Sequence, residues 1–441
     1  MNKGAKKMSF GSLVKSYKSQ IDETVYTVEH ESGLKVILIK KPGFKKCYAT
    51  FSTKYGSVNT EFIVPGETSV TKACDGVAHF LEHKVFEQPD GTNAFNEFSK
   101  YGASANAFTS FGVTNYLFSC TSNFFENLEI LLNFVQTPYF TEENVEKEKG
   151  IIAQEIKMYE DDAEQTCYYN CLKGMYKNHP IKTKIAGSVE EIMKINPDLL
   201  YKCYNTFYHP SNMAVICVGD IDEKKLLETV DKCIKINTPN EKITQVFPTE
   251  PECVVNDCIE AEFDIPVPMF MLGFKDKFTG GSSKEMIERE LLSQCVLQTL
   301  FGASSPFYTE LYEKGIINPT FCASYEYEDS CAYAMFSGES EHAQKIREEI
   351  FATIENALKN GLSPIDFERA RRMIYGRFLA NLDSVENTGN EYMFAYHRGI
   401  DLFDYPEVCE KITVEDAEKR LSELLIKENS SLSVVNPKNR G

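Results

Sequence analysis

Residues 76–86 read GVAHFLEHKVF and place two histidines and a glutamate within five consecutive positions. His79 and His83 are four positions apart, so on a helix their imidazole rings project from one face, one turn apart. Glu82 is adjacent to His83 and borders the same face. Two imidazole nitrogens at this spacing can bind Zn²⁺ and leave a carboxylate beside the water molecule that the metal activates. The segment therefore predicts a hydrolytic zinc centre with Glu82 as its base.

The alternative interpretation is a pair of histidines satisfied inside an ordinary core, which is the usual role of a single buried histidine. Two histidines and a glutamate on one turn would bring costly polar groups together without a partner, and a metal ion removes that cost. The chain has only seven histidines among 441 residues, so a chance His-x-x-Glu-His pattern is rare. We therefore favour the metal interpretation.

A catalytic zinc ion usually takes three protein ligands, so a third must come from another segment. A long helix predicted from Thr141 to about Glu160 contains Glu148 and Glu155. These glutamates are seven positions, or two turns, apart and share a face with Ile152. The alternative is an exposed acidic helix, which the neighbouring lysines and glutamates favour. The residues alone leave both interpretations open for each glutamate.

The histidine segment is predicted to be a helix over 75–86, with Asp75 as its N-cap. After a second short helix, the runs 103–110 and 114–120 are extended and flank Phe111-Gly112-Val113, a pattern typical of a hairpin. The first half of the chain is therefore expected to mix helices with strands.

The second half of the chain repeats the order of the first. Ser363-Pro364 opens a long predicted helix as Thr141-Glu142 does, at an offset of 363 − 141 = 222 positions. The strand at 432–435 lies near the same offset from a strand at 213–217. Such a repeat indicates duplication of an α+β domain of about 220 residues. The low identity between the halves leaves two unrelated mixed domains as the alternative.

The composition is globular, with 42% hydrophobic and 25% charged residues. The formal charge is 47 − 65 = −18, and no basic stripe offsets it, which argues against nucleic-acid binding. The longest nearly apolar stretch, 266–274, is far shorter than the roughly 20 residues of a membrane span. The chain is therefore expected to bind neither nucleic acid nor membrane.

The first 24 residues form a lysine-rich extension without the apolar core of a secretory signal or the arginines of a mitochondrial presequence. Its serines and lysines leave a targeting role open. Fourteen cysteines are scattered from Cys47 to Cys409 with no Cys-x-x-Cys pair, which is typical of reduced thiols in cores. We expect a cytoplasmic protein.

Four segments resemble one family of zinc peptidases. They are HFLEH, NAFTSFGVTNYLF, EKEKGIIAQEI and FYHPSNMAVICVGDID, in this order along the chain. The family includes pitrilysin, insulin-degrading enzyme and mitochondrial processing peptidase, and the His-x-x-Glu-His order is the inverzincin signature. The chain is most similar to the bacterial two-domain processing-protease subunits. The resemblance implies two homologous α+β domains, each a mainly antiparallel sheet flanked by helices, together forming half of a clamshell.

The resemblance also implies a role for each residue of the predicted centre. His79 and His83 match the family's histidine ligands of zinc, and Glu82 matches its catalytic base. Glu155 matches the third ligand. Glu148 matches a supporting glutamate two turns earlier on the same helix.

The run Asn106, Ala107, Phe108 and Thr109 matches the edge strand that pairs with the substrate backbone in relatives. This role fits β-augmentation, in which an extended peptide adds a strand to an open sheet edge. Without the resemblance, an ordinary hairpin strand would be the favoured interpretation.

The second half departs from the family pattern. Relatives with a complete site carry an arginine and a tyrosine where this chain has Tyr312 and Asn318. The half contains no His-x-x-Glu-His, and Arg377 stands 222 positions after Glu155. The resemblance therefore implies a structural second domain, and a homologous partner subunit that supplies the arginine and tyrosine in a heterodimer. The alternative is that Tyr312 serves as a substitute donor.

The expected organisation has four parts: an N-terminal extension at 1–24, a zinc-binding catalytic domain at 25–235, a linker at 236–252 and a second homologous domain at 253–441. The implied function is that of a zinc-dependent endopeptidase subunit that cleaves short or unfolded peptides, with a zinc-bound water as nucleophile. The alternatives are a non-catalytic scaffold subunit of a peptidase-like heterodimer and a hydrolase that acts on a non-peptide amide.

Overall fold

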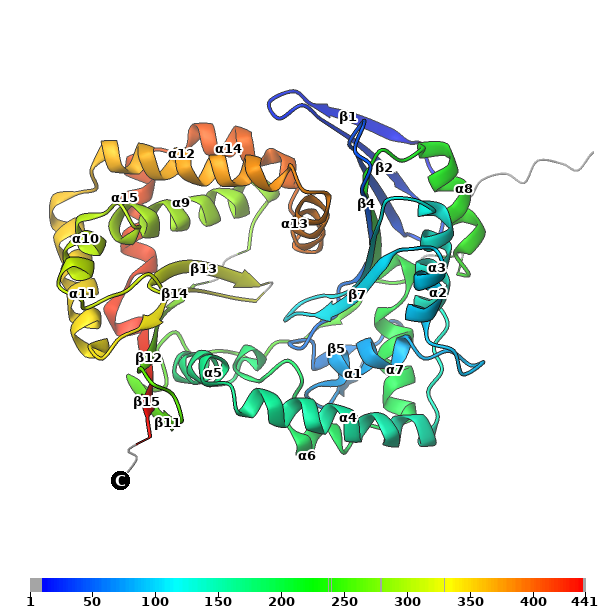
Figure 1. The fold of residues 1–441 in the computed structure, drawn as a ribbon, viewed down its shortest axis with the longest axis horizontal. Coiled ribbons are helices and arrows are strands. Elements are labelled where there is room, and N and C mark those ends of the chain that lie inside the picture. Colours follow the sequence, from blue (N-terminus) through cyan, green and yellow to red (C-terminus); the bar gives the residue numbers. More distant parts are fainter. Residues whose placement is uncertain (1–9, 237, 239, 278–279, 329, 439–441) are drawn as a thin grey trace, which may run out of the picture. The chain divides into compact units, whose positions relative to one another are not determined.

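The computed structural model describes residues 10–236, 238, 240–277, 280–328 and 330–438. The chain divides into two compact units, and each unit draws on both halves of the sequence (Figure 1). The first contains the chain up to Gln154 together with Ile185–Val246 and Ala380–His397. The second contains Glu155–Lys184, Phe247–Leu379 and the chain from Arg398 onward.

The first unit is built on a seven-stranded sheet with the order β1-β2-β3-β9-β4-β8-β7. Neighbouring strands are antiparallel except β3 and β9, which are parallel. The strands are β1 (Val14–Lys18), β2 (Glu23–Glu29), β3 (Lys35–Lys40), β4 (Cys47–Thr53), β7 (Ser104–Thr109), β8 (Thr114–Cys120) and β9 (Met213–Gly219). A small second sheet joins β10 (Thr244–Gln245), β5 (Glu61–Ile63) and β6 (Val70–Lys72).

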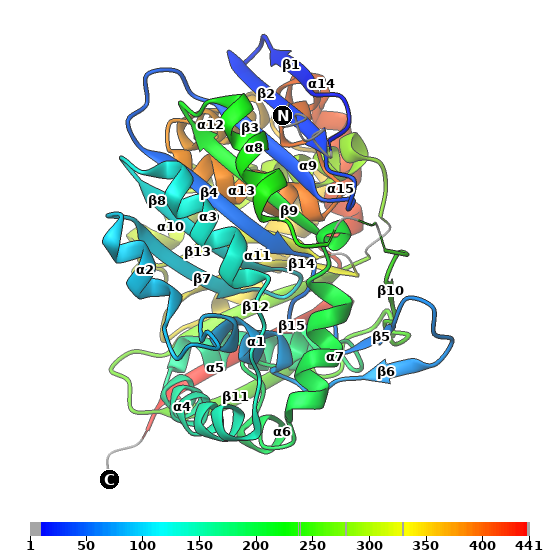
Figure 2. The same cartoon turned by 90° about the vertical axis from the view of Figure 1, so that its right-hand side faces the viewer.

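Helices cover both faces of the seven-stranded sheet. Helices α3 and α8 lie on one face and α13 lies on the other, and α3 and α8 stand in front of the strands in Figure 2. Every residue of β9 is buried, as expected for a central strand with helices on both sides. The helices of this unit are α1 (Val77–Val85), α2 (Ala94–Lys100), α3 (Phe124–Val135), α6 (Val189–Ile192), α7 (Pro197–Phe207), α8 (Glu223–Cys233) and α13 (Val385–His397), and α4 (Glu142–Glu160) continues into the second unit.

Helix α13 comes from the second half of the chain but belongs to the first unit. Its Asn390 accepts a hydrogen bond from Tyr48 Oη at 2.6 Å, and Nε2 of its His397 is 2.8 Å from Ser52 Oγ. A Cβ at Gly389 would lie 2.4 Å from the Tyr48 ring, so only glycine permits this close approach to β4. The first sheet is therefore completed by a helix that follows it by more than 150 positions.

The second unit is built on a five-stranded sheet with the order β11-β15-β12-β14-β13, in which only β11 and β15 are parallel. Helix α5, from the first half of the chain, packs on it: Sγ of Cys171 is 3.4 Å from the carbonyl oxygen of Ser431. The strands are β11 (Cys258–Phe263), β12 (Met269–Asp276), β13 (Cys322–Glu328), β14 (Cys331–Glu339) and β15 (Ser430–Pro437). The helices are α5 (Ala163–Met175), α9 (Ser283–Phe301), α10 (Pro306–Glu313), α11 (Ala343–Asn360), α12 (Pro364–Asn381), α14 (Tyr405–Lys411) and α15 (Val414–Leu424).

The two sheets share one topology. In the first sheet, with the order β3-β9-β4-β8-β7, the late strand β9 lies between the earlier strands β3 and β4 and is parallel to β3. In the second sheet, with the order β11-β15-β12-β14-β13, the late strand β15 lies in the same way between β11 and β12 and is parallel to β11. The predicted α+β fold of two homologous domains is confirmed, with each sheet mixed and mainly antiparallel. The exchange of α5 and α13 between the halves is an addition that the sequence pattern did not indicate.

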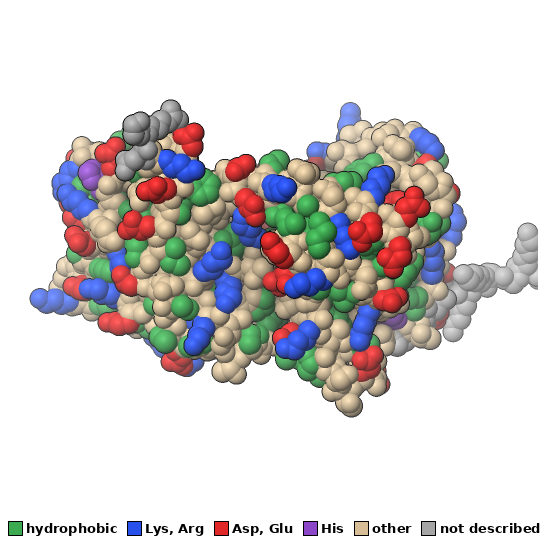
Figure 3. Space-filling view, turned by 90° about the horizontal axis from the view of Figure 1, so that it is seen from below, with side chains coloured by type: hydrophobic (Ala, Val, Ile, Leu, Met, Phe, Trp, Pro, Cys, Tyr) green, Lys and Arg blue, Asp and Glu red, His purple; other side chains and the backbone are tan. Residues whose placement is uncertain are grey.

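Two further expectations concern the surface and the thiols. All fourteen cysteines have free thiols, as expected from their scattered spacing. In the part of the chain that the structure covers, no helix is both long and apolar enough to cross a membrane. On the face drawn in Figure 3, acidic and basic side chains are intermingled.

Candidate metal centre

Helix α1 begins at a tight turn that glycine makes possible. Gly76 is the N-cap residue, with a φ of 87° in the left-handed region. A Cβ at this position would lie 2.5 Å from the carbonyl oxygen of Ala186, so the start of α1 is packed directly against that loop. The prediction of Asp75 as N-cap is wrong, because the residue that turns the chain into the helix must adopt a positive φ and have no side chain.

Helix α1 buries an apolar face that also includes Lys84, and its two histidines lie on another face. Val77, Phe80, Leu81 and Val85 are fully buried. His79 and His83 lie on the remaining face with their ring centroids 4.6 Å apart, as the four-residue spacing predicts. The apolar contacts of the helix thus fix the direction in which both imidazoles point.

Helix α4 carries the two candidate glutamates. Thr141 precedes it as predicted, and its hydroxyl accepts the backbone N–H of Asn144 at 3.2 Å. The helix buries Val145, Ile152 and Ile156. Glu148 and Glu155 border this buried stripe and are half-buried, so the alternative of a fully exposed acidic face does not hold for them.

The structure brings His79, His83 and Glu155 together. One potential ligand atom from each lies within 4.8 Å of the other two. Tyr159, one turn after Glu155, donates its hydroxyl to Glu155 Oε1 at 2.8 Å. Two imidazole nitrogens and one carboxylate oxygen are a donor set that suits Zn²⁺ and is typical of catalytic zinc sites. The residues present therefore fit a zinc ion.

Glu148 lies beside His83. Its Oε1 is 3.1 Å from His83 Nδ1, and its Oε2 is 3.9 Å from Lys84 Nζ. Burial alone would raise the pKa of Glu148, but the hydrogen bond and charge of His83, aided by Lys84, outweigh it and hold the pKa below its usual value. Glu148 thus contacts a ligand candidate and lies outside the three-residue group.

Glu82 and the predicted edge strand meet at one hydrogen bond. The hydroxyl of Thr109 donates to Glu82 Oε2 at 2.8 Å. Among the described residues, strand β7 is the last strand of the seven-stranded sheet and pairs only with β8. Asn106 is exposed, Ala107 is half-buried, and the Phe108 ring lies 5.8 Å from that of Phe394 in α13. The predicted strand is therefore at a sheet edge and is tied to α1.

Two residues near this centre, Tyr159 and Lys84, were not predicted from the sequence. Tyr159 is four positions after Glu155, a helical spacing that places both on one face, so this contact could have been predicted. Lys84 is fully buried, and since lysine is rarely found inside a protein, no pattern in the sequence indicates its position.

The residues singled out in the second half belong to the second unit. Tyr312 is half-exposed on α10 and its ring stacks on Tyr308. The side-chain oxygen of Asn318 accepts hydrogen bonds from the backbone and hydroxyl of Thr320 at 2.8 and 2.5 Å. Arg377 lies in α12.

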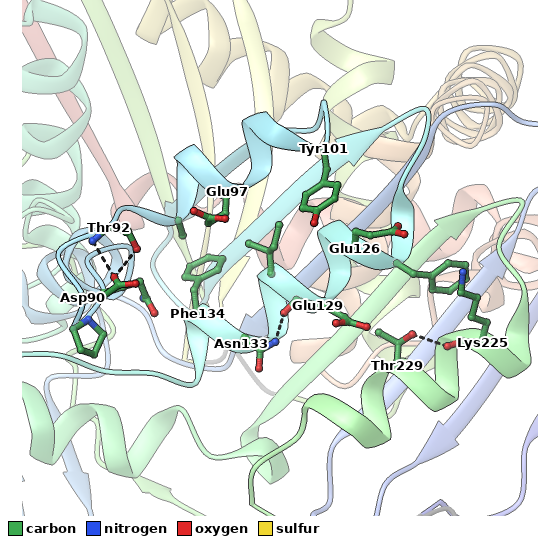
Figure 4. Close-up of a pocket in the computed structure, with 15 residues that line it drawn as sticks. Asp90, Thr92, Glu97, Tyr101, Glu126, Glu129, Asn133, Phe134, Lys225 and Thr229 are labelled. Atoms are coloured by element: carbon green, nitrogen blue, oxygen red, sulfur yellow. Dashed lines mark hydrogen bonds between the residues drawn. The ribbon is translucent and has the colours of Figure 1, made fainter.

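A depression of about 800 Å³ lies elsewhere on the first unit, lined by residues of α2, α3, α8 and the loop after α1 (Figure 4). Its polar groups bond locally: Asn133 donates to the carbonyl oxygen of Glu129, and Thr229 donates to that of Lys225, both at 2.7 Å. His79, His83 and Glu155 are not among its lining residues. The depression is therefore separate from the cluster of His79, His83 and Glu155.

Family models match most of the chain. The model described as insulinase, peptidase family M16, matches residues 62–189, and the model of the peptidase M16 inactive domain matches residues 194–374. The second match agrees with the absence of a His-x-x-Glu-His sequence from the second half.

Individual relatives cover nearly the whole chain. The uncharacterized zinc protease YmfH of Bacillus subtilis is 41% identical over 421 residues, which are 95% of this chain and 98% of that protein. The zinc protease PqqE of Helicobacter pylori is 22% identical over 372 residues, 81% of either chain. A crystal structure of an M16-like peptidase from Alicyclobacillus acidocaldarius superposes with a TM-score of 0.90 and 33% identity, and the match covers 97% of this chain and 99% of that one. The chain belongs to the insulinase family of zinc proteases, peptidase family M16.

Proposed function

We propose that the chain is a zinc-dependent endopeptidase in which His79, His83 and Glu155 bind the metal and Glu82 is the catalytic base. The observation that carries this proposal is the convergence within 4.8 Å of three ligand atoms, two from α1, which also carries Glu82, and one from α4. Zinc, when bound, would lower the pKa of water and polarise a carbonyl group.

In this proposal, Glu82 transfers the protons. Its carboxylate accepts a proton from the attacking water and then delivers one to the leaving amine, as general base and general acid in turn. The hydrogen bond from Thr109 limits the orientations that this carboxylate can take. A base held in one orientation loses less entropy on reaching the transition state.

The substrate of this proposed reaction is an extended peptide. In the part of the chain that the structure describes, no further strand lies beside the outer edge of β7, so the backbone of Asn106 to Thr109 can pair with a peptide there. Because Thr109 contacts Glu82, a peptide on this edge would pass close to the base. Short or unfolded chains supply such a free strand, whereas most strands of a folded protein are already paired on both sides.

The partner and the compartment belong to the proposal as well. Tyr312 and Asn318 stand where the resemblance calls for an arginine and a tyrosine, and we propose that a homologous subunit supplies that pair in a heterodimer. The intact ligand set in this chain supports the catalytic role over that of a non-catalytic scaffold. Fourteen free thiols support a reducing compartment, the cytoplasm. The catalytic domain would span residues 25–235.

The experiment is a paired measurement of zinc content and cleavage of an unfolded peptide. The purified chain should hold about one zinc per molecule, and removal of the zinc by a chelator should stop cleavage that added Zn²⁺ then restores. Zinc-independent cleavage, or a chain that binds no zinc, would overturn the proposal. A chain that binds zinc but cleaves nothing, with or without a co-purifying homologue, would favour the scaffold role.

A further inference from the structure

Lys84 is a buried cation beside the candidate metal centre. It follows His83 in α1, and its side chain is only 1% exposed. Removing a charged ammonium group from water is costly unless the group is paired. We therefore expect favourable interactions of Lys84 with other groups to offset the cost of burying its charge.

The ammonium group of Lys84 lies between two carboxylates. It donates a hydrogen bond to Glu87, just beyond the C-terminal end of α1, and lies 3.9 Å from Oε2 of Glu148 on α4. The other oxygen of Glu148 is 3.1 Å from Nδ1 of His83. Each oxygen of Glu148 thus faces one of two consecutive residues of α1.

We infer that Lys84 is a positioning residue that acts through Glu148 on the zinc ligand His83. Lys84 attracts one oxygen of the carboxylate and so keeps the other directed at Nδ1 of His83. A hydrogen on Nδ1 leaves the lone pair of the imidazole on Nε2, the nitrogen then available to a metal. The inference rests on the proposed zinc site and adds to it an ionic chain of Glu87, Lys84, Glu148 and His83.

A purely electrostatic role of Lys84 and a positioning role predict changes of opposite sign in zinc affinity when Lys84 is removed. A fixed positive charge near the centre repels a metal cation, so its removal would strengthen zinc binding if charge alone mattered. A positioning role predicts that its removal weakens zinc binding, because His83 loses its fixed orientation. The sign of the change in zinc affinity therefore separates the two.

The first test measures the zinc dissociation constant by competition with a chromogenic chelator, using the full chain. Lys84→Met, which keeps length and removes charge, should weaken zinc binding about tenfold, at the lower end of the range for residues that orient a ligand. Lys84→Arg should retain most of the affinity. Unchanged or tighter binding in Lys84→Met would overturn the inference.

Lys149 provides a matched control. It is also a buried lysine, 7% exposed, it neighbours Glu148 in sequence, and it pairs with a glutamate three positions earlier, Glu146. Lys149→Met should leave zinc affinity unchanged, because Lys149 makes no contact with Glu148 among the described interactions. An equal loss in both variants would show a general effect of removing a buried charge, and would overturn the inference.

A double-mutant cycle tests the route through Glu148. In a Glu148→Ala background, Lys84→Met should weaken zinc binding no further, because the contact through which Lys84 acts is already gone. Additive losses would overturn the inference. The wild-type measurement distinguishes the two proposals: a wild-type chain without zinc affinity contradicts the zinc site itself, whereas normal wild-type binding with an unaffected Lys84→Met contradicts only the role of Lys84.

Folding of the variants is checked by thermal unfolding of the metal-free proteins. If Lys84→Met does not fold, the variant Lys84→Met with Glu87→Gln also removes the charge of Glu87, so that one carboxylate fewer is left without its cation. The same tenfold weakening is expected there, and its absence would again overturn the inference.

Discussion

The hydroxyl of Thr109, at the end of edge strand β7, donates a hydrogen bond of 2.8 Å to the carboxylate of Glu82 on α1. This contact joins the strand proposed to bind the substrate to the residue proposed to move the proton. A residue of the proposed substrate-binding strand therefore also orients the proposed base.

Thr109→Val should lower kcat for peptide cleavage by about 10- to 100-fold, because a hydrogen bond to a charged group contributes about 1.5–3 kcal/mol. Valine keeps the shape and β-branching of threonine and loses only the donor. Zinc content should not change. Thr109→Ser, which keeps the hydroxyl, serves as the control. Full activity in Thr109→Val would show that this bond does not assist catalysis.

Glu82→Gln should retain zinc and lose cleavage, because it removes a base and no metal ligand. His79→Ala and Glu155→Gln should lose both zinc and cleavage. Glu148→Gln should weaken zinc binding less than Glu155→Gln does, since Glu148 touches a ligand and lies outside the three-residue group. Metal analysis after dialysis, paired with a peptide assay, measures these effects. The reverse order for the two glutamates would exchange their roles.

Tyr159→Phe should weaken zinc binding several-fold while the fold stays intact. The tyrosine hydroxyl donates to Glu155 Oε1 and so orients this carboxylate, and its loss gives Glu155 more rotational freedom. Chelator competition measures the change, and Tyr204→Phe, which removes a hydroxyl that donates to the carbonyl oxygen of Val135, is the control. Identical affinities of Tyr159→Phe and the wild type would contradict an orienting role.

Acid should loosen the first unit at α13. Burial, with the charge of Lys54, lowers the pKa of His397 from 6.5 to about 3, so the folded chain holds this imidazole neutral. The unfolded chain binds a proton near pH 6.5, so the contribution of His397 is complete above that pH and is lost as the pH falls toward 3. The slope from one such group is about 1.4 kcal/mol per pH unit.

Urea unfolding of the wild type and of His397→Gln at pH 7, 6 and 5 measures this effect. The wild type should lose stability more steeply than the variant as the pH falls, although the variant is less stable at pH 7, where the bond to Ser52 is lost. Parallel pH profiles of the two proteins would contradict the prediction.

The chain alone should cleave peptides poorly and gain activity with a homologous subunit. Loss of one oxyanion donor typically costs about 10²–10³ in rate, and Tyr312 and Asn318 stand at both positions where the resemblance implies an arginine and a tyrosine. Turnover by the zinc-loaded chain is measured alone and with any co-purifying homologue. Full activity alone would point to Tyr312 as donor, and Tyr312→Phe would then abolish it.

The part of the centre that lies on one helix could be predicted, because helical periodicity alone places His79, Glu82 and His83 on adjoining faces. The choice between Glu148 and Glu155 could not be made from the residues, since two turns of separation leave both on one face. It depends on how α4 packs against α1, which is a tertiary relationship. The resemblance to a family supplied that choice, and Glu155 is the glutamate whose carboxylate lies near both histidines in the three-residue group.

The order of secondary structure predicted two similar sheets and could not predict which helix covers which sheet. Helices α5 and α13 each follow the long helix of their own half, so a local pattern assigns each to the nearer sheet. Burial of Tyr48 and Ser52 against α13 decides otherwise. Long-range packing of this kind leaves no periodic signal in the sequence.

The exchange of α5 and α13 makes the chain an internal domain swap. A cut within residues 236–252 would separate each of these helices from the sheet that it covers. The first fragment would have a sheet that lacks α13 and exposes an apolar face, and it would carry α5 without the sheet on which α5 packs. The second fragment would have a sheet without α5. Neither fragment is then a self-sufficient folding unit, so each should aggregate alone and recover its structure only when the two are refolded together. After duplication, this swap would have made each copy depend on the other for folding. The second, metal-free copy would then have been preserved as a folding partner of the first.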